Sequence, residues 1–170
     1  RIAGDEINDS ISSYLKKNHG LAVGERTAEK IKIKIGSAFP DDNFDNSSYE
    51  VRGLHLSSGL PRSITLTSGE IREAMADPLN KIVEAIKRTL ERTPPELAAD
   101  IVERGIMLAG GGALIRGMND LVTKETGIFT HIAEEPLLCV VNGCGKILDD
   151  FRKLRRIVDT TDSGTNSIRT

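Results

Sequence analysis

Three consecutive glycines, Gly110, Gly111 and Gly112, are the residues of this sequence whose type and spacing best suit ligand binding. The four residues before them, 106–109, are apolar and typical of a short buried strand. A helical pattern that includes Leu114 follows directly. Glycine lets a backbone approach a ligand without a Cβ atom in the way, and a helix start offers free N–H groups. The segment therefore predicts either a ligand-binding loop or, equally well for a bare glycine cluster, a tight turn without a ligand.

The sequence lacks the residue patterns of several common catalytic sites. Its three histidines and two cysteines give no Cys–His or Ser–His–Asp arrangement and no cluster of metal ligands. A Walker A phosphate loop needs Lys followed by Ser or Thr after its last glycine, whereas Ala113 follows Gly112 here. A dinucleotide fingerprint needs separated glycines, and these three are consecutive. We therefore expect no catalytic residue and no metal site within this chain.

Length and composition fit one ordinary domain or two small lobes. The chain has 170 residues, of which 38% are hydrophobic, so a core can form. The formal net charge of −2 gives no electrostatic case for binding nucleic acid, which calls for a basic face. Cys139 and Cys144 are expected to be reduced thiols, as in a cytosolic protein. Because the chain begins with Arg1 rather than Met, we expect it to be part of a longer protein.

Two helices are predicted at the start of the chain. Apolar residues at helical spacing predict the first over 6–18. The segment 24–36 is ambiguous, because isoleucines alternate with lysines in its second half as they do in a strand. Its first half favours a helix, and Gly36 would cap one. We therefore predict a helix, in which Glu29 and Lys32 are close enough to form a surface ion pair.

A hairpin, a long helix and an α/β segment are predicted for the rest of the chain. Alternating apolar residues at 49–54 and 60–67 predict two antiparallel strands. Ser68 is expected to cap the long helix that follows, and Pro78 to kink or divide it. Beyond residue 93, helices and short strands alternate.

The last predicted helix, 137–148, contains two glycines, Gly143 and Gly145. Each costs about 1 kcal/mol relative to alanine within a helix, so we expect both to pack closely against another backbone or a ligand loop. Residues 151–170 are rich in Ser, Thr, Asp and Gly and are predicted to be a disordered tail.

Three segments of the sequence resemble the actin-like ATPases. Residues 108–117 (LAGGGALIRG) resemble the adenosine loop of that superfamily, and 136–145 (PLLCVVNGCG) resemble its second connecting helix. Residues 27–32 (TAEKIK) resemble the helix that lays Glu and Lys against the adenine and ribose. Within the superfamily, the sequence is similar to the MreB family of bacterial actins that direct rod shape. That similarity covers about residues 1–150 and is carried by 4–6, 24–29, 93–97 and 103–106.

The resemblance implies an α/β fold, namely a ribonuclease-H-like, actin-like ATPase domain with an inserted small α+β subdomain. Residues 1–23 and 91–150 would form the core, called subdomain IIA, and residues 24–90 would form the inserted subdomain IIB. The first large domain of the family, with both phosphate-binding hairpins and the catalytic Glu, would lie outside this chain.

An adenosine site is also implied by the resemblance. Glu29 and Lys32 would bracket the adenosine from subdomain IIB, with Lys30 and Ile31 between them. Four residues would pass beneath the adenine and the α-phosphate: Gly110, Gly111, Gly112 and Ala113. A side chain at the glycines would strike the nucleotide. The implied cofactor is ATP or ADP with Mg²⁺, and the Mg²⁺ would be held mostly by the missing half.

Three functional interpretations follow. In the first, the chain is the nucleotide-binding half of a bacterial actin homologue. That homologue would form ATP-dependent head-to-tail filaments at the inner face of the cell membrane and direct rod shape and wall synthesis. A RodZ-like membrane protein would bind subdomain IIA, and this half alone would be inactive as an ATPase. In the second, the chain is a non-catalytic docking domain for a membrane partner. In the third, it belongs to another actin-fold ATPase, a chaperone or a sugar kinase, although it lacks a peptide-binding domain and a sugar-pocket motif.

Overall fold

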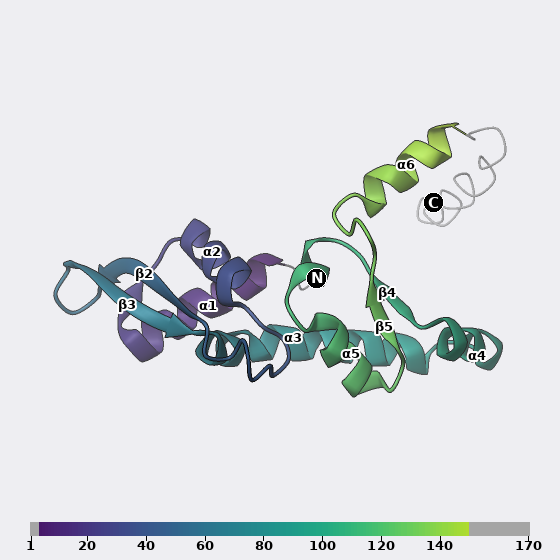
Figure 1. The fold of residues 1–170 in the computed structure, drawn as a ribbon, viewed down its shortest axis with the longest axis horizontal. Coiled ribbons are helices and arrows are strands. Elements are labelled where there is room, and N and C mark those ends of the chain that lie inside the picture. Colours follow the sequence, from purple (N-terminus) through teal and green to yellow (C-terminus); the bar gives the residue numbers. More distant parts are fainter. Residues whose placement is uncertain (1–3, 150–170) are drawn as a thin grey trace, which may run out of the picture.

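The structure is a computed structural model that describes residues 4–149, so the predicted tail at 151–170 lies outside the described residues. Figure 1 shows an elongated molecule in which one long helix, α3, runs along the long axis. In chain order the elements are α1 Gly4–His19, β1 Leu21–Ala22, α2 Glu25–Ile35, β2 Ser48–His55, β3 Pro61–Thr67, α3 Ser68–Glu91, α4 Pro95–Arg104, β4 Ile106–Leu108, a 3-10 turn η1 Gly111–Leu114, α5 Met118–Thr126, β5 Thr130–Ile132 and α6 Cys139–Asp149.

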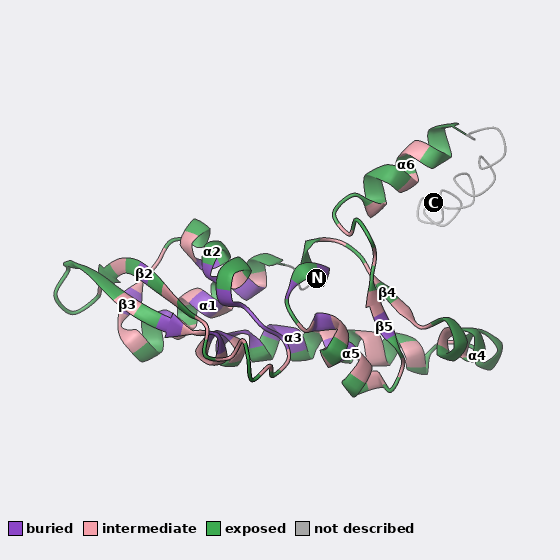
Figure 2. Ribbon diagram, in the orientation of Figure 1, coloured by how far each residue is buried: buried purple, intermediate pink, exposed green. Residues whose placement is uncertain are grey.

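The hydrophobic core lies where α1, α2 and α3 meet. α1 buries Ile7, Ile11 and Leu15, whose spacing of four residues places them on one face. α2 and α3 turn their own apolar faces toward this stripe, and α5 adds Met118 and Val122. The buried residues in Figure 2 are accordingly concentrated along these helices. The helix predicted over 24–36 is confirmed, because its isoleucines face two ways: Ile31 and Ile35 are buried and Ile33 is exposed.

The predicted hairpin is confirmed and forms most of a three-stranded antiparallel sheet in the order β1-β2-β3. Val51 of β2 pairs with Ile64 of β3, and the short β1 pairs with the far edge of β2. Gly53 is needed here, because a Cβ atom on it would lie 2.5 Å from the carbonyl oxygen of Ala22. The sheet therefore fixes the segment that joins α1 to α2.

The start of α3 differs from the sequence prediction. Thr67, not Ser68, is the cap: its hydroxyl accepts from the Glu70 N–H, while the Glu70 carboxylate accepts from the Thr67 N–H at 2.8 Å. This reciprocal arrangement satisfies two helix-end donors at once. The prediction of Ser68 was wrong because Ser68 is itself the first helical residue and is buried.

Pro78 lies inside α3 without dividing it into two helices. Proline has no N–H, so the carbonyl of Ala74, four residues earlier, loses its helical partner. Ser10 of α1 replaces that partner, because its hydroxyl donates to the Ala74 oxygen at 2.6 Å. The contact between α1 and α3 thus compensates for the proline, which the sequence of α3 alone could not reveal.

The second half of the chain is much less buried than the first. β4 and β5 form a parallel pair in which Met107 is 63% exposed, so the prediction of a buried strand was wrong. No helix follows the glycines directly: a 3-10 turn comes first, and α5 begins only after Gly117, whose φ is +71°. In a sheet of two strands each strand has one edge without a neighbouring strand.

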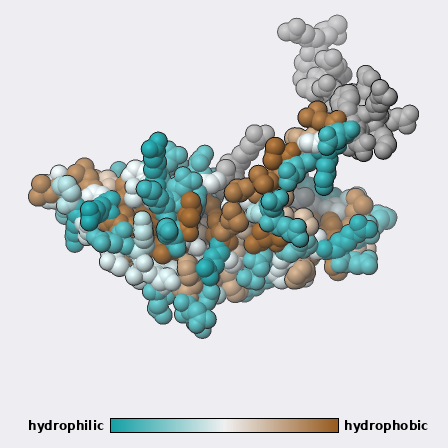
Figure 3. Space-filling model, turned by 45° about the horizontal axis from the view of Figure 1, so that its top comes forward, coloured by the Kyte–Doolittle hydropathy of each residue, from teal (hydrophilic) through white to brown (hydrophobic). Residues whose placement is uncertain are grey.

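α6 projects away from the other elements (Figure 1), and none of its residues is buried. A Cβ atom built on Gly143 or Gly145 would meet nothing within 4 Å, so the close packing predicted for them is not found in the described residues. Figure 3 shows hydrophobic side chains along this arm, where Val140 is 75% exposed and Leu148 is 72% exposed. Between residues 4 and 149, no helix has the length and apolar character needed to cross a membrane.

Candidate functional site

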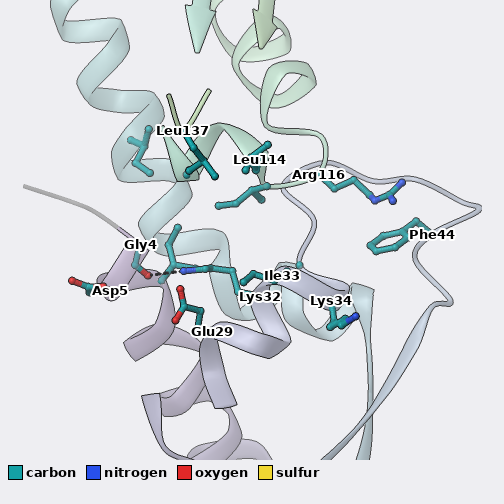
Figure 4. Close-up of a pocket in the computed structure, with 16 residues that line it drawn as sticks. Gly4, Asp5, Glu29, Lys32, Ile33, Lys34, Phe44, Leu114, Arg116 and Leu137 are labelled. Carbon is teal, nitrogen blue, oxygen red and sulfur yellow. Dashed lines mark hydrogen bonds between the residues drawn. The ribbon is translucent and has the colours of Figure 1, made fainter. Parts of the chain in front are cut away.

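A cavity of about 1000 Å³ lies between the glycine turn and α2 (Figure 4). Its walls come from segments far apart in the sequence, namely α1, α2, the loop after α2, α3, the glycine motif and the loop that carries Leu137. The lining residues are Gly4, Asp5, Ile7, Glu29, Lys32, Ile33, Lys34, Gly36, Phe44, Ile82, Gly111, Gly112, Leu114, Ile115, Arg116 and Leu137. This volume is at the upper end of the range for small-molecule pockets, about 300–1000 Å³.

One wall of the cavity is the exposed side of α2. Because Ile31 is anchored in the core, Glu29 and Lys32 lie on the neighbouring face and line the cavity. The predicted ion pair between these two side chains is not formed. Lys32 Nζ instead donates to the carbonyl oxygen of Gly4 at 3.2 Å, which ties α2 to the start of α1.

The opposite wall is the glycine turn. Gly110 has φ +84° and its N–H donates to the Pro136 carbonyl at 2.7 Å, so the turn itself requires glycine there. Gly111 and Gly112 have no such requirement. A Cβ atom would meet only Leu137 Cδ2 at 3.6 Å from Gly111, and nothing within 4 Å from Gly112. Their missing side chains leave space open on the cavity side.

The structure divides the eight predicted site residues into two groups. Glu29, Lys32, Gly111 and Gly112 face one another across the cavity. The other four do not line it: Gly110 shapes the turn, Lys30 is exposed, and Ile31 and Ala113 are buried. Four of the eight predicted residues therefore line this cavity, and the helical period alone could have shown that Lys30 and Ile31 face elsewhere.

Sequence reasoning missed the residues at the rim of the cavity. Arg116 lies over the ring of Phe44, with 3.9 Å between the guanidinium carbon and the ring centroid. Ile33, Leu114 and Leu137 contribute apolar surface from three different segments. The glycine-loop motif contained Arg116, but nothing in the sequence indicated that a residue 72 positions earlier would lie beneath it.

The chemistry of the cavity suits a ligand with an apolar ring, hydroxyl groups and negative charge. Lys32, Lys34 and Arg116 carry positive charge, and Asp5 and Glu29 supply carboxylate acceptors. Between residues 4 and 149, no group of three or more His, Cys, Asp or Glu residues could hold a metal ion. Cys139 and Cys144 are free thiols. The described residues therefore form a candidate binding site whose lining contains no histidine or cysteine.

Comparison with known proteins gives a consistent result. The family model described as MreB/Mbl protein matches residues 1–156. The cell shape-determining protein MreB of Escherichia coli (strain K12) is 50% identical over 149 residues, which are 88% of this chain and 42% of that protein. The cell shape-determining protein Mbl of Bacillus subtilis (strain 168) is 46% identical over 154 residues, 91% of this chain and 46% of Mbl. The chain thus spans less than half the length of these relatives.

Solved structures agree with the sequence comparison. The crystal structure of MreB5 of Spiroplasma citri bound to ADP superposes with a TM-score of 0.85 and 35% identity, covering 91% of this chain and 46% of MreB5. A MamK double helical filament superposes with a TM-score of 0.65 at 21% identity, over 79% of this chain and 41% of MamK, which is a likeness of fold alone. The predicted actin-like fold is therefore confirmed.

Proposed function

Because the chain belongs to the MreB/Mbl family of cell shape-determining proteins, we propose that it is the nucleotide-binding half of a bacterial actin homologue. The whole protein would form ATP-dependent filaments that direct rod shape and wall synthesis. The observation that carries this proposal is the pair of cavity walls, with Glu29 and Lys32 on one side and Gly111 and Gly112 on the other. The docking-domain alternative is not favoured, because the relatives are named for determining cell shape.

The geometry of the cavity fits a nucleoside bound between its two walls. The Glu29 carboxylate can accept hydrogen bonds from sugar hydroxyls, and the Lys32 ammonium can donate once it leaves the Gly4 carbonyl. The space beside Gly111 and Gly112 has room for a base or an α-phosphate. A Cβ atom at Gly111 would meet only Leu137, and one at Gly112 would meet no atom within 4 Å. MreB5 is known in ADP-bound and AMPPNP-bound forms, which supports the same ligand class for this chain.

The remaining parts of the proposal concern the whole protein. ATP or ADP would bind with Mg²⁺, and most of the Mg²⁺ ligands would come from the half outside this chain, since residues 4–149 offer no metal-ligand cluster. The whole protein would associate with itself head to tail. We further propose location at the inner face of the cell membrane and binding of a RodZ-like membrane protein by subdomain IIA. The chain alone would not hydrolyse ATP.

The proposed division into subdomains places residues 1–23 and 91–150 in the actin-like core and 24–90 in the insertion. The boundary at residue 23 falls between β1 and α2. α1 nevertheless packs against both α2 and α3, so the two proposed parts share one hydrophobic core.

An NMR titration of the isotope-labelled chain with ADP tests the proposal. We expect amide shifts at 29–32 and 110–113, either with the chain alone or once the missing half is supplied in trans. Glu29→Ala should reduce the shifts, whereas the matched variant Glu84→Ala should not, because Glu84 is exposed on α3 and, among the described residues, pairs only with Arg88. Absence of shifts under both conditions would favour the docking-domain alternative.

A further inference from the structure

The segment 36–47, here called the strap, connects α2 to β2 and passes beside the end of the glycine motif. Its first half is fixed to that motif by the backbone. The Ala38 N–H donates to the Arg116 carbonyl at 2.8 Å, and Ser37 and Arg116 form an isolated parallel bridge. Gly117 allows this approach, since a Cβ atom there would lie 2.7 Å from Cβ of Phe39. The strap, which continues from the α2 wall, is therefore joined by its backbone to the end of the glycine motif, which forms the other wall.

The second half of the strap is fixed to the start of α3. Both carboxylate oxygens of Asp45 accept from the Arg72 guanidinium, which holds the pKa of Asp45 below its ordinary value. The Ser68 N–H donates to the Ser47 carbonyl at 2.9 Å. The strap is thus held at both ends, and its middle is folded by turn hydrogen bonds of its own, among them Phe44 N–H to the Asp41 carbonyl at 2.9 Å.

The Arg116 side chain lies against this turn in the middle of the strap. Its guanidinium lies 3.9 Å from the Phe44 ring centroid, and its Nη1 lies 3.9 Å from Asp41 Oδ2. Both Arg116 and Phe44 line the cavity. Figure 4 shows this stack at the opposite end of the cavity from the hydrogen bond between Lys32 and Gly4. A contact at each end of the cavity therefore joins two of the segments that line it.

We propose that Arg116 is a positioning residue for the nucleotide, acting through Phe44. By stacking on Phe44 it holds the strap against the glycine motif, and so fixes the distance between the wall that carries Glu29 and Lys32 and the wall that carries Gly111. This inference rests on the proposed function. A cation–π contact at a partly exposed site stabilises by an amount equivalent to about a two- to fivefold change in an equilibrium constant, which bounds the expected effect on affinity.

Calorimetric titration of the full-length protein with ADP tests this proposal. Arg116→Ala and Phe44→Leu should each weaken ADP binding about two- to fivefold, and the double variant should be no weaker than either single variant. Arg116→Lys should recover part of the loss, because an ammonium over the ring keeps the cation–π contact. Arg88→Ala, at an exposed arginine remote from the cavity lining, is the matched control and should leave affinity unchanged.

The outcomes separate the two proposals. Unchanged affinity in Arg116→Ala, or additive losses in the double variant, would overturn the role of the stack while leaving nucleotide binding intact. Additive losses would mean instead that Arg116 contacts the nucleotide directly. If the unaltered full-length protein binds no ADP, the proposed function fails and the positioning role fails with it. Circular dichroism of each variant at the titration temperature establishes that the change lies in binding and not in folding.

Discussion

Gly111→Val is expected to separate ligand binding from folding. The backbone at Gly111 has no positive φ, so a side chain is compatible with its conformation. Its Cβ atom would meet only Leu137 Cδ2, at 3.6 Å, which is an ordinary van der Waals contact. Replacing glycine where the new residue fits also restricts the unfolded chain, by about 0.4–1 kcal/mol in favour of folding. We therefore expect the free energy of unfolding to change by no more than about 1 kcal/mol.

Nucleotide affinity is expected to change much more than stability. The added methyl groups would occupy space on the cavity side, where the ligand is proposed to lie. Forcing extra carbon atoms into a filled site costs about 1–3 kcal/mol, which corresponds to about 5- to 150-fold weaker binding. Gly111→Ala should show a smaller loss in the same direction. Calorimetric titration of the full-length protein with ADP measures the affinity, and urea unfolding followed by circular dichroism measures the stability.

The adjacent glycine provides the matched control. Gly110 has φ +84°, a conformation that costs a residue with a side chain about 1–3 kcal/mol, and nothing lies within 4 Å of its Cβ position. Gly110→Ala should therefore lower stability more than Gly111→Val does. If Gly111→Val unfolds the protein, or binds ADP as well as the unaltered protein does, the assignment of this wall to the ligand is refuted.

Four further outcomes are expected. Ser10→Ala should lower the free energy of unfolding by about 1 kcal/mol. The loss should be smaller in a Pro78→Ala background, because the N–H at position 78 can then donate to the Ala74 carbonyl. Equal losses in the two backgrounds, measured by urea unfolding, would contradict this role of Ser10. Thr67→Ala should cost about 1 kcal/mol in the same assay through loss of the cap of α3, and no loss would mean that the cap is dispensable. Asp45 has a lowered pKa in the folded state, so its contribution is present above the ordinary aspartate value of 3.8 and is lost as the pH falls below it. The melting temperature should therefore fall less steeply with acidification in Asp45→Asn, and parallel curves would exclude this contribution. The purified 170-residue chain should release no phosphate from ATP above background, and release would show a catalytic group within it.

Local patterns predicted most of the elements, because the spacing of apolar residues within each element reflects the face that it buries. The isoleucines of α2 show where a short local pattern cannot distinguish a strand from a helix. Alternation suggested a strand, yet only two of the three are buried, as a helix with one apolar face requires. Pro78 illustrates the opposite case, since the Ser10 hydroxyl that compensates for it lies 64 residues before Ala74, whose carbonyl it binds. A contact of that kind has no local signal.

The parts of the candidate site that lie in a family motif could be predicted from the sequence. The resemblance pointed to both walls, at Glu29 and Lys32 and at the glycines, and the structure brings them to one cavity. The rim was not predictable, because Phe44 belongs to a polar loop whose path is set by Arg72 and the Arg116 backbone. The packing expected for Gly143 also failed within the described residues, because α6 has no partner element among them.

The uneven burial of the chain has a consequence for how its unfolding would be observed. α4 and α6 contain no buried residue, whereas α1, α2 and α3 carry most of the core. Segments with few buried contacts open locally at much lower free energy than the global transition requires. Backbone amides of α4 and α6 should therefore exchange with deuterium early, and those facing Ile11 and Met75 last. A single melting temperature for this chain would therefore measure the cooperative unfolding of the helices and strands before residue 91. Local opening of β4, β5 and α6 at lower temperature would not change it.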